Sequence, residues 1–291
     1  MKSKTTALLL LIMVASLWSV SGLFVKVIDC SPLALSSARG LFAALTISFL
    51  LPGGLHFQSL TKGHWITGAC LMLLSITFIS GMKLTAAANV IVLQYSAPIW
   101  VAIIAPLVLR ERTGGRDWLF MIIIFGGVIL FFLDGITAKG IWGNVLGLVS
   151  GFFFAIQALL LRRLKNKTPA RAMILGNYLT FIVGIPFLLA SWPSLTGWLA
   201  LLAMGVLQMG LPYFLYTMAV PRVSSLELVV VTMLEPVLCP LWVYLFLDER
   251  PGRYAILGAV TVIAAVTIWS VLKALEEHRL TKGELPARRP Q

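Results

Sequence analysis

The sequence predicts an all-α polytopic membrane protein, with ten transmembrane helices arranged as two inverted five-helix repeats around a central cavity. The prediction depends on the composition, on recurring long apolar runs, and on motifs shared by the two halves. Of the 291 residues, 59% are hydrophobic and only 12% are charged, whereas soluble domains average about 25% charged residues. Each run has about 20 residues, so each is long enough to cross a bilayer as a helix.

Short polar breaks such as "KLT" and "DERPGR" separate the apolar runs, and no soluble domain interrupts them. The first run is too long for the apolar region of a signal peptide and lacks a small-residue cleavage site after it. We therefore expect it to be the first span. The ten expected spans lie near residues 5–27, 32–51, 65–82, 85–108, 117–133, 141–161, 170–190, 195–219, 224–247 and 252–274.

The basic residues are distributed unequally between the two sides of these spans. The net charge is +12, which in a soluble protein would suggest binding to nucleic acid. With the N-terminus inside, 17 of the 23 Lys and Arg residues lie on cytoplasmic segments, four lie on the other side, and Lys26 and Arg39 lie within spans. This bias predicts that both termini are cytoplasmic and accounts for the charge without a nucleic-acid partner.

The two halves share a motif at a constant offset of 138 residues. The segment "YSAPIWVAIIAPLVLRERTGGR" from Tyr95 aligns with "MLEPVLCPLWVYLFLDERPGR" from Met233. Pro98 falls on Pro236, and the Glu-Arg pair and the following glycine also coincide. We therefore expect one five-helix repeat over residues 1–138, a second over 139–275, and a flexible charged cytoplasmic tail over 276–291.

Each repeat contains an odd number of spans, so the second copy enters the membrane from the opposite side. Inverted repeats are typical of secondary transporters. In one arrangement of the two repeats the cavity opens inward. If each repeat adopts the conformation of the other, the cavity opens outward. The two states then have similar energies, and the cavity can alternate.

The motifs also resemble those of the drug/metabolite transporter superfamily, in its EamA-type ten-span branch. The resemblance covers nearly the whole chain and is carried by "LWSVSGLFVK", "ARGLFAAL", "APIWVAIIAPLVLRER" and "EPVLCPLWVYLFLDER". It implies transport of small metabolites without ATP, through a cavity lined by spans 1–4 and 6–9, with spans 5 and 10 at the periphery. The chain has "LRER" and "LDER" where the family commonly has Leu-Gly-Glu.

Glu235 is the most informative candidate residue, because it lies near the middle of the ninth run, directly before Pro236. A carboxylate at the bilayer centre costs about 2.5–3.5 kcal/mol on insertion scales, so we expect it to face a cavity or a partner. Pro236 lacks a backbone N–H and frees a carbonyl one turn earlier, and Pro98 predicts the same break in span 4. Trp242 lies about 20° from Glu235 around the helix. A carboxylate beside an indole suits an amine or a quaternary cation.

Other polar and aromatic residues within spans complete the candidate site. Arg39 is expected to pair with an anionic group or to close a gate; the alternatives are that it snorkels or satisfies carbonyls at a helix end. Glu227 is expected to face water near the interface. Glu235 has two alternative roles, as the site of a coupled proton and as a packing hydrogen bond. The proposed gate or coupling residues are Arg39, Pro98, Pro236 and Glu235. The proposed substrate-binding residues are Trp18, Ser21, Tyr95, Gln157, Tyr178, Gln208, Tyr213, Glu235 and Trp242.

Several other function classes lack their motifs. The spans contain no His, no paired Asp and no HExxH, so we expect neither catalytic nor metal-binding residues, and three scattered cysteines predict no disulfide framework. No Gly-rich phosphate loop predicts ATP binding, and we expect no cofactor. The expected partners are a small-molecule substrate and membrane lipid, with protons as an alternative, in a monomer or a homodimer. We expect export across a bacterial inner membrane; uptake or exchange of a cationic amine, a channel and a membrane enzyme remain alternatives.

Overall fold

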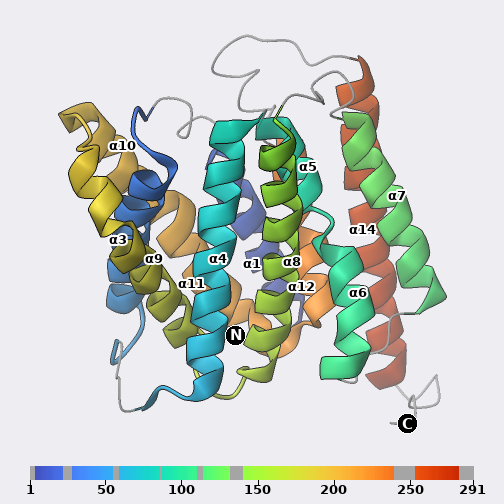
Figure 1. Ribbon diagram of the computed structural model, residues 1–291. Helices are drawn as coiled ribbons and strands as arrows, with labels where there is room; N and C mark the ends of the chain where they lie inside the picture. The colour runs from blue at the N-terminus through green and yellow to red at the C-terminus, as the bar shows by residue number, and fades with distance from the viewer. Residues whose placement is uncertain are drawn as a thin grey trace.

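The computed structural model describes residues 4–21, 28–54, 59–85, 87–109, 114–131, 140–238 and 253–281. Every regular element within these ranges is a helix, in agreement with the predicted all-α class. Figure 1 shows long helices packed side by side, with α7 and α14 together at one edge of the bundle. In chain order the elements are α1 (Lys4–Trp18), α3 (Pro32–Leu50), α4 (Lys62–Leu84), α5 (Ala87–Gln94), α6 (Ala97–Val108), α7 (Gly115–Phe131), α8 (Ile141–Arg163), α9 (Ala170–Ala190), α10 (Leu195–Ala203), the π-helix η2 (Met204–Gly210), α11 (Leu211–Ala219), the 3-10 helix η3 (Val220–Arg222), α12 (Ser225–Thr232) and α14 (Arg253–Thr281).

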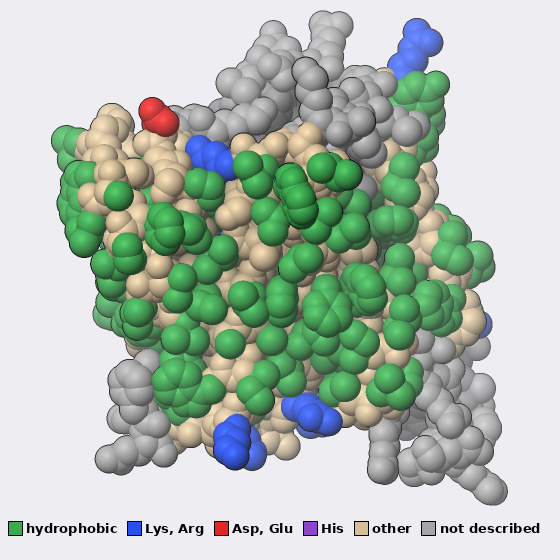
Figure 2. Space-filling model, in the orientation of Figure 1, with side chains coloured by type: hydrophobic (Ala, Val, Ile, Leu, Met, Phe, Trp, Pro, Cys, Tyr) green, Lys and Arg blue, Asp and Glu red, His purple; other side chains and the backbone are tan. Residues whose placement is uncertain are grey.

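The outer surface of the bundle is apolar over its middle. Figure 2 shows a broad belt of hydrophobic side chains, with Lys and Arg side chains near its upper and lower edges. Phe49 and Leu107, for example, are 90% and 82% exposed. Five of the described helical stretches are long and apolar enough to cross a membrane. Lipid is the surrounding in which such a belt is stable.

Polar caps begin several of these helices near the ends of the bundle. The Ser31 hydroxyl accepts a hydrogen bond from the Ala34 N–H, and Pro32 follows at the first helical position of α3. Ser224 and Glu227 form a reciprocal capping box at the start of α12. These caps satisfy backbone donors that the first helical turn leaves without partners.

The fourth expected span, 85–108, is interrupted. α5 ends at Gln94, a turn follows at Tyr95 and Ser96, and α6 begins at Ala97. The chain after α12 shows the same pattern, with a turn at residues 233–234 and helix again over 235–238. In each case a proline is the second residue of the resumed helix, and its missing N–H weakens the helix across the turn.

The eighth expected span, 195–219, contains a π-helical segment in its middle, η2, between α10 and α11. Glycine lets η2 lie against α3, because a Cβ on Gly205 would lie 2.4 Å from the Cβ of Phe42. Such segments often occur at functional sites, since they redirect the side chains they carry.

Three glycines on α8, spaced four residues apart, pack against the chain of spans 3 and 4. Gly143 lies against Thr85, Gly147 against Val90, and Gly151 against the carbonyl oxygen of Gln94. A Cβ on Gly151 would lie only 2.7 Å from that oxygen. The glycine stripe therefore provides close packing within the chain.

Basic side chains gather at one end of the bundle, where α1 begins and α8 ends; this end is lower in Figure 1. There Arg162 donates to the carbonyl of Val220 at 3.0 Å and Arg163 to the carbonyl of Val108 at 2.8 Å. Lys83 lies at the opposite end, in the last turn of α4. The described side chains thus retain the charge asymmetry seen in the sequence.

Candidate functional site

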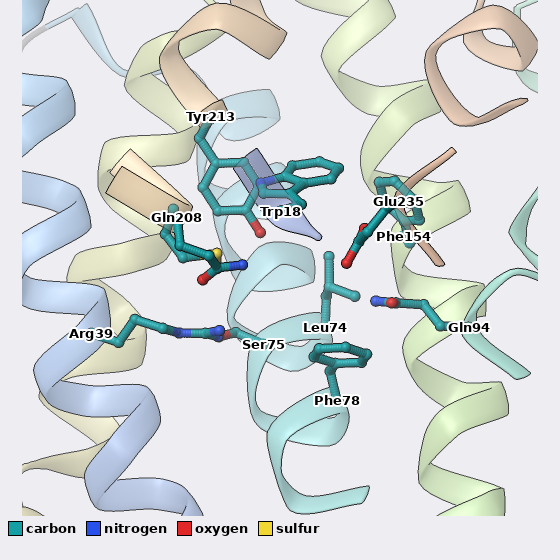
Figure 3. A pocket seen from close by; sticks show the side chains of 11 residues that line it. Trp18, Arg39, Leu74, Ser75, Phe78, Gln94, Phe154, Gln208, Tyr213 and Glu235 are labelled. Atoms are coloured by element: carbon teal, nitrogen blue, oxygen red, sulfur yellow. The ribbon is translucent and has the colours of Figure 1, made fainter. Parts of the chain in front are cut away.

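A cavity with both polar and apolar side chains on its walls lies between helices from both halves of the chain (Figure 3). The space between its side chains has a volume of about 440 Å³, which includes the part that is open to the surroundings. Most of its side chains come from the middle of their helices, so the cavity lies well inside the apolar belt. The lining residues are Trp18, Arg39, Leu74, Ser75, Phe78, Gln94, Phe154, Gln208, Met209, Tyr213 and Glu235.

Glu235 lies on one wall of the cavity and is 8% exposed. The Tyr95 hydroxyl lies 2.6 Å from its carboxylate and 3.0 Å from the carbonyl oxygen of Thr232. Thr232 is four residues before Pro236, whose missing N–H leaves that carbonyl without its usual helical donor. Tyr95, from the break in span 4, therefore compensates for the break beside Glu235.

Arg39 projects from α3 on another wall and is 2% exposed. Its Nη2 donates a 2.6 Å hydrogen bond to the Ser75 hydroxyl, and its Nε has no hydrogen-bond partner among the described residues. No described carboxylate lies within ion-pair distance of the guanidinium. Arg39 therefore does not snorkel, and its charge faces the cavity.

An aromatic cluster surrounds the end of α1 in the cavity. The Trp18 ring lies 5.5 Å from Tyr213, 5.7 Å from Tyr216 and 6.1 Å from Phe154, measured between ring centroids. The edge-to-face geometry with Tyr213 and Phe154 is favourable for aromatic pairs. The indole Nε1 is buried and has no hydrogen-bond partner among the described residues. The cluster therefore combines an apolar wall with a free donor.

The π-helix η2 carries Gln208 and Met209 into the cavity. Gln208 is buried, and its Oε1 lacks a described hydrogen-bond partner. A buried polar atom without a partner costs about 1–3 kcal/mol. Together with Arg39 and Trp18, Gln208 leaves hydrogen-bonding capacity that a bound molecule can use.

The structure brings some of the sequence-predicted residues together and separates others. Trp18, Gln208, Tyr213, Glu235 and Arg39 line the cavity, and Tyr95 lies directly behind Glu235. Their role in substrate binding stays a prediction. The other proposed residues do not line it: Pro98 and Pro236 are buried near the breaks, Ser21, Gln157 and Tyr178 lie elsewhere, and Trp242 lies outside the described residues.

Gln157 shows why the sequence could not separate these cases. It is fully buried in α8, but its amide nitrogen faces the Met173 sulfur at 3.4 Å rather than the cavity. The periodicity of an apolar helix does not distinguish a face that packs on a neighbour from a face that lines a void. Such buried polar groups often join helices within a membrane.

Six lining residues were not among the candidates, namely Leu74, Ser75, Phe78, Gln94, Phe154 and Met209. One signal for Ser75 was available, because the 138-residue offset relates it to Tyr213. The apolar residues carry no comparable signal, since most Leu and Phe residues in a span face lipid or a neighbouring helix.

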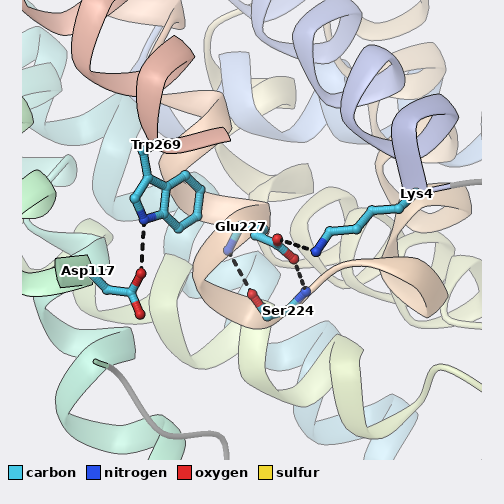
Figure 4. Close-up of polar contacts among 5 residues, drawn as sticks. All are labelled: Lys4, Asp117, Ser224, Glu227 and Trp269. Carbon is cyan, nitrogen blue, oxygen red and sulfur yellow. Dashed lines mark hydrogen bonds and ion pairs between the residues drawn. The ribbon is translucent and has the colours of Figure 1, made fainter. Parts of the chain in front are cut away.

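The expectation that Glu227 faces water is wrong. Its side chain is 5% exposed and lies 2.7 Å from the Lys4 ammonium group (Figure 4). The carboxylate also accepts a 2.7 Å hydrogen bond from the Ser224 N–H. Helix α1 packs against the start of α12 and encloses the carboxylate, which the sequence of a single span cannot predict.

A second polar contact in Figure 4 joins Trp269 to Asp117 at 3.0 Å and connects α14 to α7.

A helical bundle with a broad apolar surface is typical of an integral membrane protein, and this bundle has a cavity between its two halves. The chain belongs to the EamA-like transporter family, whose model matches residues 5–133 and again 141–271. Within the described residues, no group of three or more His, Cys, Asp or Glu side chains is placed to hold a metal ion.

Individual relatives extend this similarity over most of the chain. An uncharacterized transporter of Archaeoglobus fulgidus is 26% identical, over 91% of this chain and 97% of the relative. The uncharacterized transporter YxxF of Bacillus subtilis is 22% identical, over 97% and 95%. Human solute carrier family 35 member G1 is 30% identical over 49% of this chain and 41% of its own. A crystal structure with 17% identity has the same fold, with a TM-score of 0.80 over 93% of this chain and 99% of that one.

Proposed function

We propose that this protein is a secondary transporter that exports a small metabolite, such as an amino acid, an amine or a related amphipathic compound, by alternating access. The observation that carries the proposal is a cavity within an apolar belt that has two buried ionisable side chains, Arg39 and Glu235, on its walls. Burying ionisable side chains in a membrane is costly, and such residues usually mark a substrate or ion pathway. A membrane enzyme is a weaker interpretation, because the cavity lining contains no nucleophile–base pair.

The proposed architecture is ten spans in two inverted repeats. Helix limits support it, because starts and ends recur at the 138-residue offset: Pro32 with Ala170, Ala87 with Ser225, Gln94 with Thr232, and Gly115 with Arg253. The repeat relates α1 to α8, α3 to α9, α4 to the stretch from α10 to η3, and α7 to α14. These matches link helices that have no obvious sequence identity.

The helix contacts support the same symmetry. α3 packs on its repeat mate α9, and α7 packs on its repeat mate α14. The contact of α4 with α8 has its counterpart in α1 with α11, and that of α4 with α9 in α3 with η2. The contact of α5 with α8 corresponds to that of α12 with α1. The contacts between helices therefore recur when each helix is replaced by its repeat mate. Such symmetry suits an inward-open and an outward-open state of nearly equal energy.

The proposed orientation has both termini in the cytoplasm of a bacterial cell, with the chain in the inner membrane. The gathering of basic residues at the end where α1 begins supports it. The two broken helices meet at Tyr95 and Glu235, so they provide a place where the halves can move relative to each other. Helices from both halves of one chain line the cavity, which supports a monomer as the proposed transporting unit.

Purified protein in liposomes tests the proposal. Vesicles preloaded with a panel of metabolites should exchange radiolabelled substrate without ATP, and an imposed pH gradient should reveal any coupling to protons. Glu235→Gln should lower the initial rate at least tenfold for cationic substrates or abolish the response to pH. Asp29→Asn, which removes an exposed carboxylate outside the cavity, should behave like the wild type. Normal transport by Glu235→Gln at every pH and with every substrate would refute the role of Glu235, and absence of exchange across the panel would refute the transport proposal.

A further inference from the structure

We propose that the cavity selects a small zwitterion, with its anionic group bound to Arg39 and its cationic group bound to Glu235. This inference rests on the proposed transport function and goes further by naming the charge pattern of the substrate. It requires both charges on one molecule. A simple amine or a simple organic acid is therefore expected to be a poor ligand.

The first step concerns the hydrogen-bond and charge partners of Arg39. The guanidinium is buried and donates one described hydrogen bond, to the Ser75 hydroxyl at 2.6 Å. Its Nε is buried without a described partner. A buried charge without an opposite charge is strongly unfavourable, and a guanidinium matches the planar geometry of a carboxylate. An anionic group is therefore the ligand that this wall binds best.

The second step concerns the hydrogen-bond and charge partners of Glu235. Its described hydrogen bond comes from the Tyr95 hydroxyl at 2.6 Å, and no described cation lies within ion-pair distance of it. One hydroxyl satisfies only part of the accepting capacity of a carboxylate. Gln94 is drawn on the same side of the cavity as the carboxylate in Figure 3, and its amide carries no charge. An ammonium group supplies both the missing donors and the missing positive charge.

The third step is the separation of the two charges. Arg39 and Glu235 line the same cavity and are farther apart than an ion pair. Figure 3 shows Gln208 and Tyr213 on the wall between them. The two side chains therefore do not neutralise each other directly. A zwitterion compensates both charges at once, whereas a singly charged molecule leaves one of them buried and uncompensated.

The fourth step is the rest of the lining, which is apolar and aromatic. Leu74, Phe78 and Phe154 line the cavity together with Trp18. These side chains suit a short aliphatic or aromatic body between the charged groups. The indole ring of Trp18 can additionally attract the cationic group through its face. Charge pattern and apolar body together describe an amino-acid-like molecule.

A binding series on the full-length wild-type protein tests the inference directly. The probes are α-, β- and γ-amino acids of matched carbon number, each compared with the amine that lacks the carboxylate and the acid that lacks the amine. Ligand-dependent thermal stabilisation in detergent and competition binding in nanodiscs measure affinity. At least one zwitterion should bind at least tenfold more tightly than both of its singly charged analogues. Equal or tighter binding of the amine or the acid in every series would overturn the inference.

Two variants assign the charges. Arg39→Gln should lower affinity for the zwitterion at least tenfold and leave affinity for the matched amine nearly unchanged, and Glu235→Gln should do the same relative to the matched acid. Arg253→Gln and Asp29→Asn remove exposed charges outside the cavity and serve as controls for net charge. Arg39→Lys keeps the charge and should retain the preference for the zwitterion if Arg39→Gln does not fold. The assignment fails if these variants weaken zwitterion and single-charge ligands by the same factor.

The outcome separates this inference from the proposed function. Transport of a singly charged compound, with no preference for the zwitterion, would leave the transporter proposal intact and refute the charge pattern. Binding that requires both charges, in a protein that moves none of these ligands across liposomes, would support the charge pattern and refute transport.

Discussion

The Tyr95 hydroxyl lies 2.6 Å from the Glu235 carboxylate, and this contact joins the interrupted helix of one half of the chain to the interrupted helix of the other. The same hydroxyl lies 3.0 Å from the carbonyl of Thr232. The two proline-associated breaks are thus connected through one phenol group next to the cavity. Any movement of one half relative to the other therefore involves this contact.

Tyr95→Phe keeps the ring and removes the hydroxyl. We expect the free energy of unfolding to fall by about 1–3 kcal/mol, because two buried acceptors lose this donor. We also expect slower transport, since the Glu235 carboxylate is no longer held in place. Thermal unfolding in detergent and liposome exchange measure the two effects. Tyr178→Phe, at a half-buried tyrosine outside the cavity, is the control, and equal behaviour of the two variants would contradict the prediction.

Gly151→Ala tests the close packing of α8 on the break in span 4. The new Cβ would lie 2.7 Å from the Gln94 carbonyl oxygen and 2.8 Å from the Ser96 Oγ, so we expect a loss of about 1–3 kcal/mol of stability from overpacking. A Cβ on Gly126 would meet no atom within 4 Å. Gly126→Ala should therefore be neutral or stabilise the helix slightly. Comparison of the two melting temperatures checks this, and a stable Gly151→Ala protein would show that α8 can move away freely.

The ion pair of Lys4 with Glu227 is expected to hold α1 against α12 at the basic end of the bundle. In Glu227→Gln the amide oxygen can still accept a hydrogen bond from the Ser224 N–H, but the negative charge is lost. We expect this variant to lower the free energy of unfolding by about 1–3 kcal/mol. Charge reversal in the double variant Lys4→Glu, Glu227→Lys should recover part of the stability lost in each single reversal. A double-mutant cycle of thermal unfolding measures the coupling. A coupling free energy near zero would show that the pair does not stabilise this end.

Cys30 provides a test of orientation and of local chemistry. It lies between α1 and α3, half-buried, at the end of the bundle where Lys83 lies. Burial raises the pKa of its thiol, and the charge of Lys83 opposes this increase only partly. Because the thiolate is the reactive form, labelling by an impermeant maleimide should be slow at pH 7 and accelerate as the pH rises. Labelling should occur in intact cells and disappear in Cys30→Ser; labelling only after permeabilisation would reverse the proposed orientation.

Most of the helical framework was predictable because it depends on local sequence properties. Run length, hydropathy and basic residues at loop positions identify spans, since lipid imposes the same requirement on every exposed backbone group. The proline positions also located the breaks approximately, as a missing N–H is a property of the residue itself. The π-helical segment η2 was not predictable, because its geometry depends on contacts with α3.

The sequence by itself determined the all-helical class and the family. It also made Glu235 a candidate residue, because a carboxylate in an apolar run is costly wherever the helix lies. Only the tertiary structure decided that Arg39 shares a cavity with Glu235, that Tyr95 is the partner of Glu235, and that Glu227 pairs with Lys4. The physical reason is that a helix exposes several faces, and hydropathy does not say whether a face meets lipid, another helix or a void. That choice is made by packing between segments far apart in the chain.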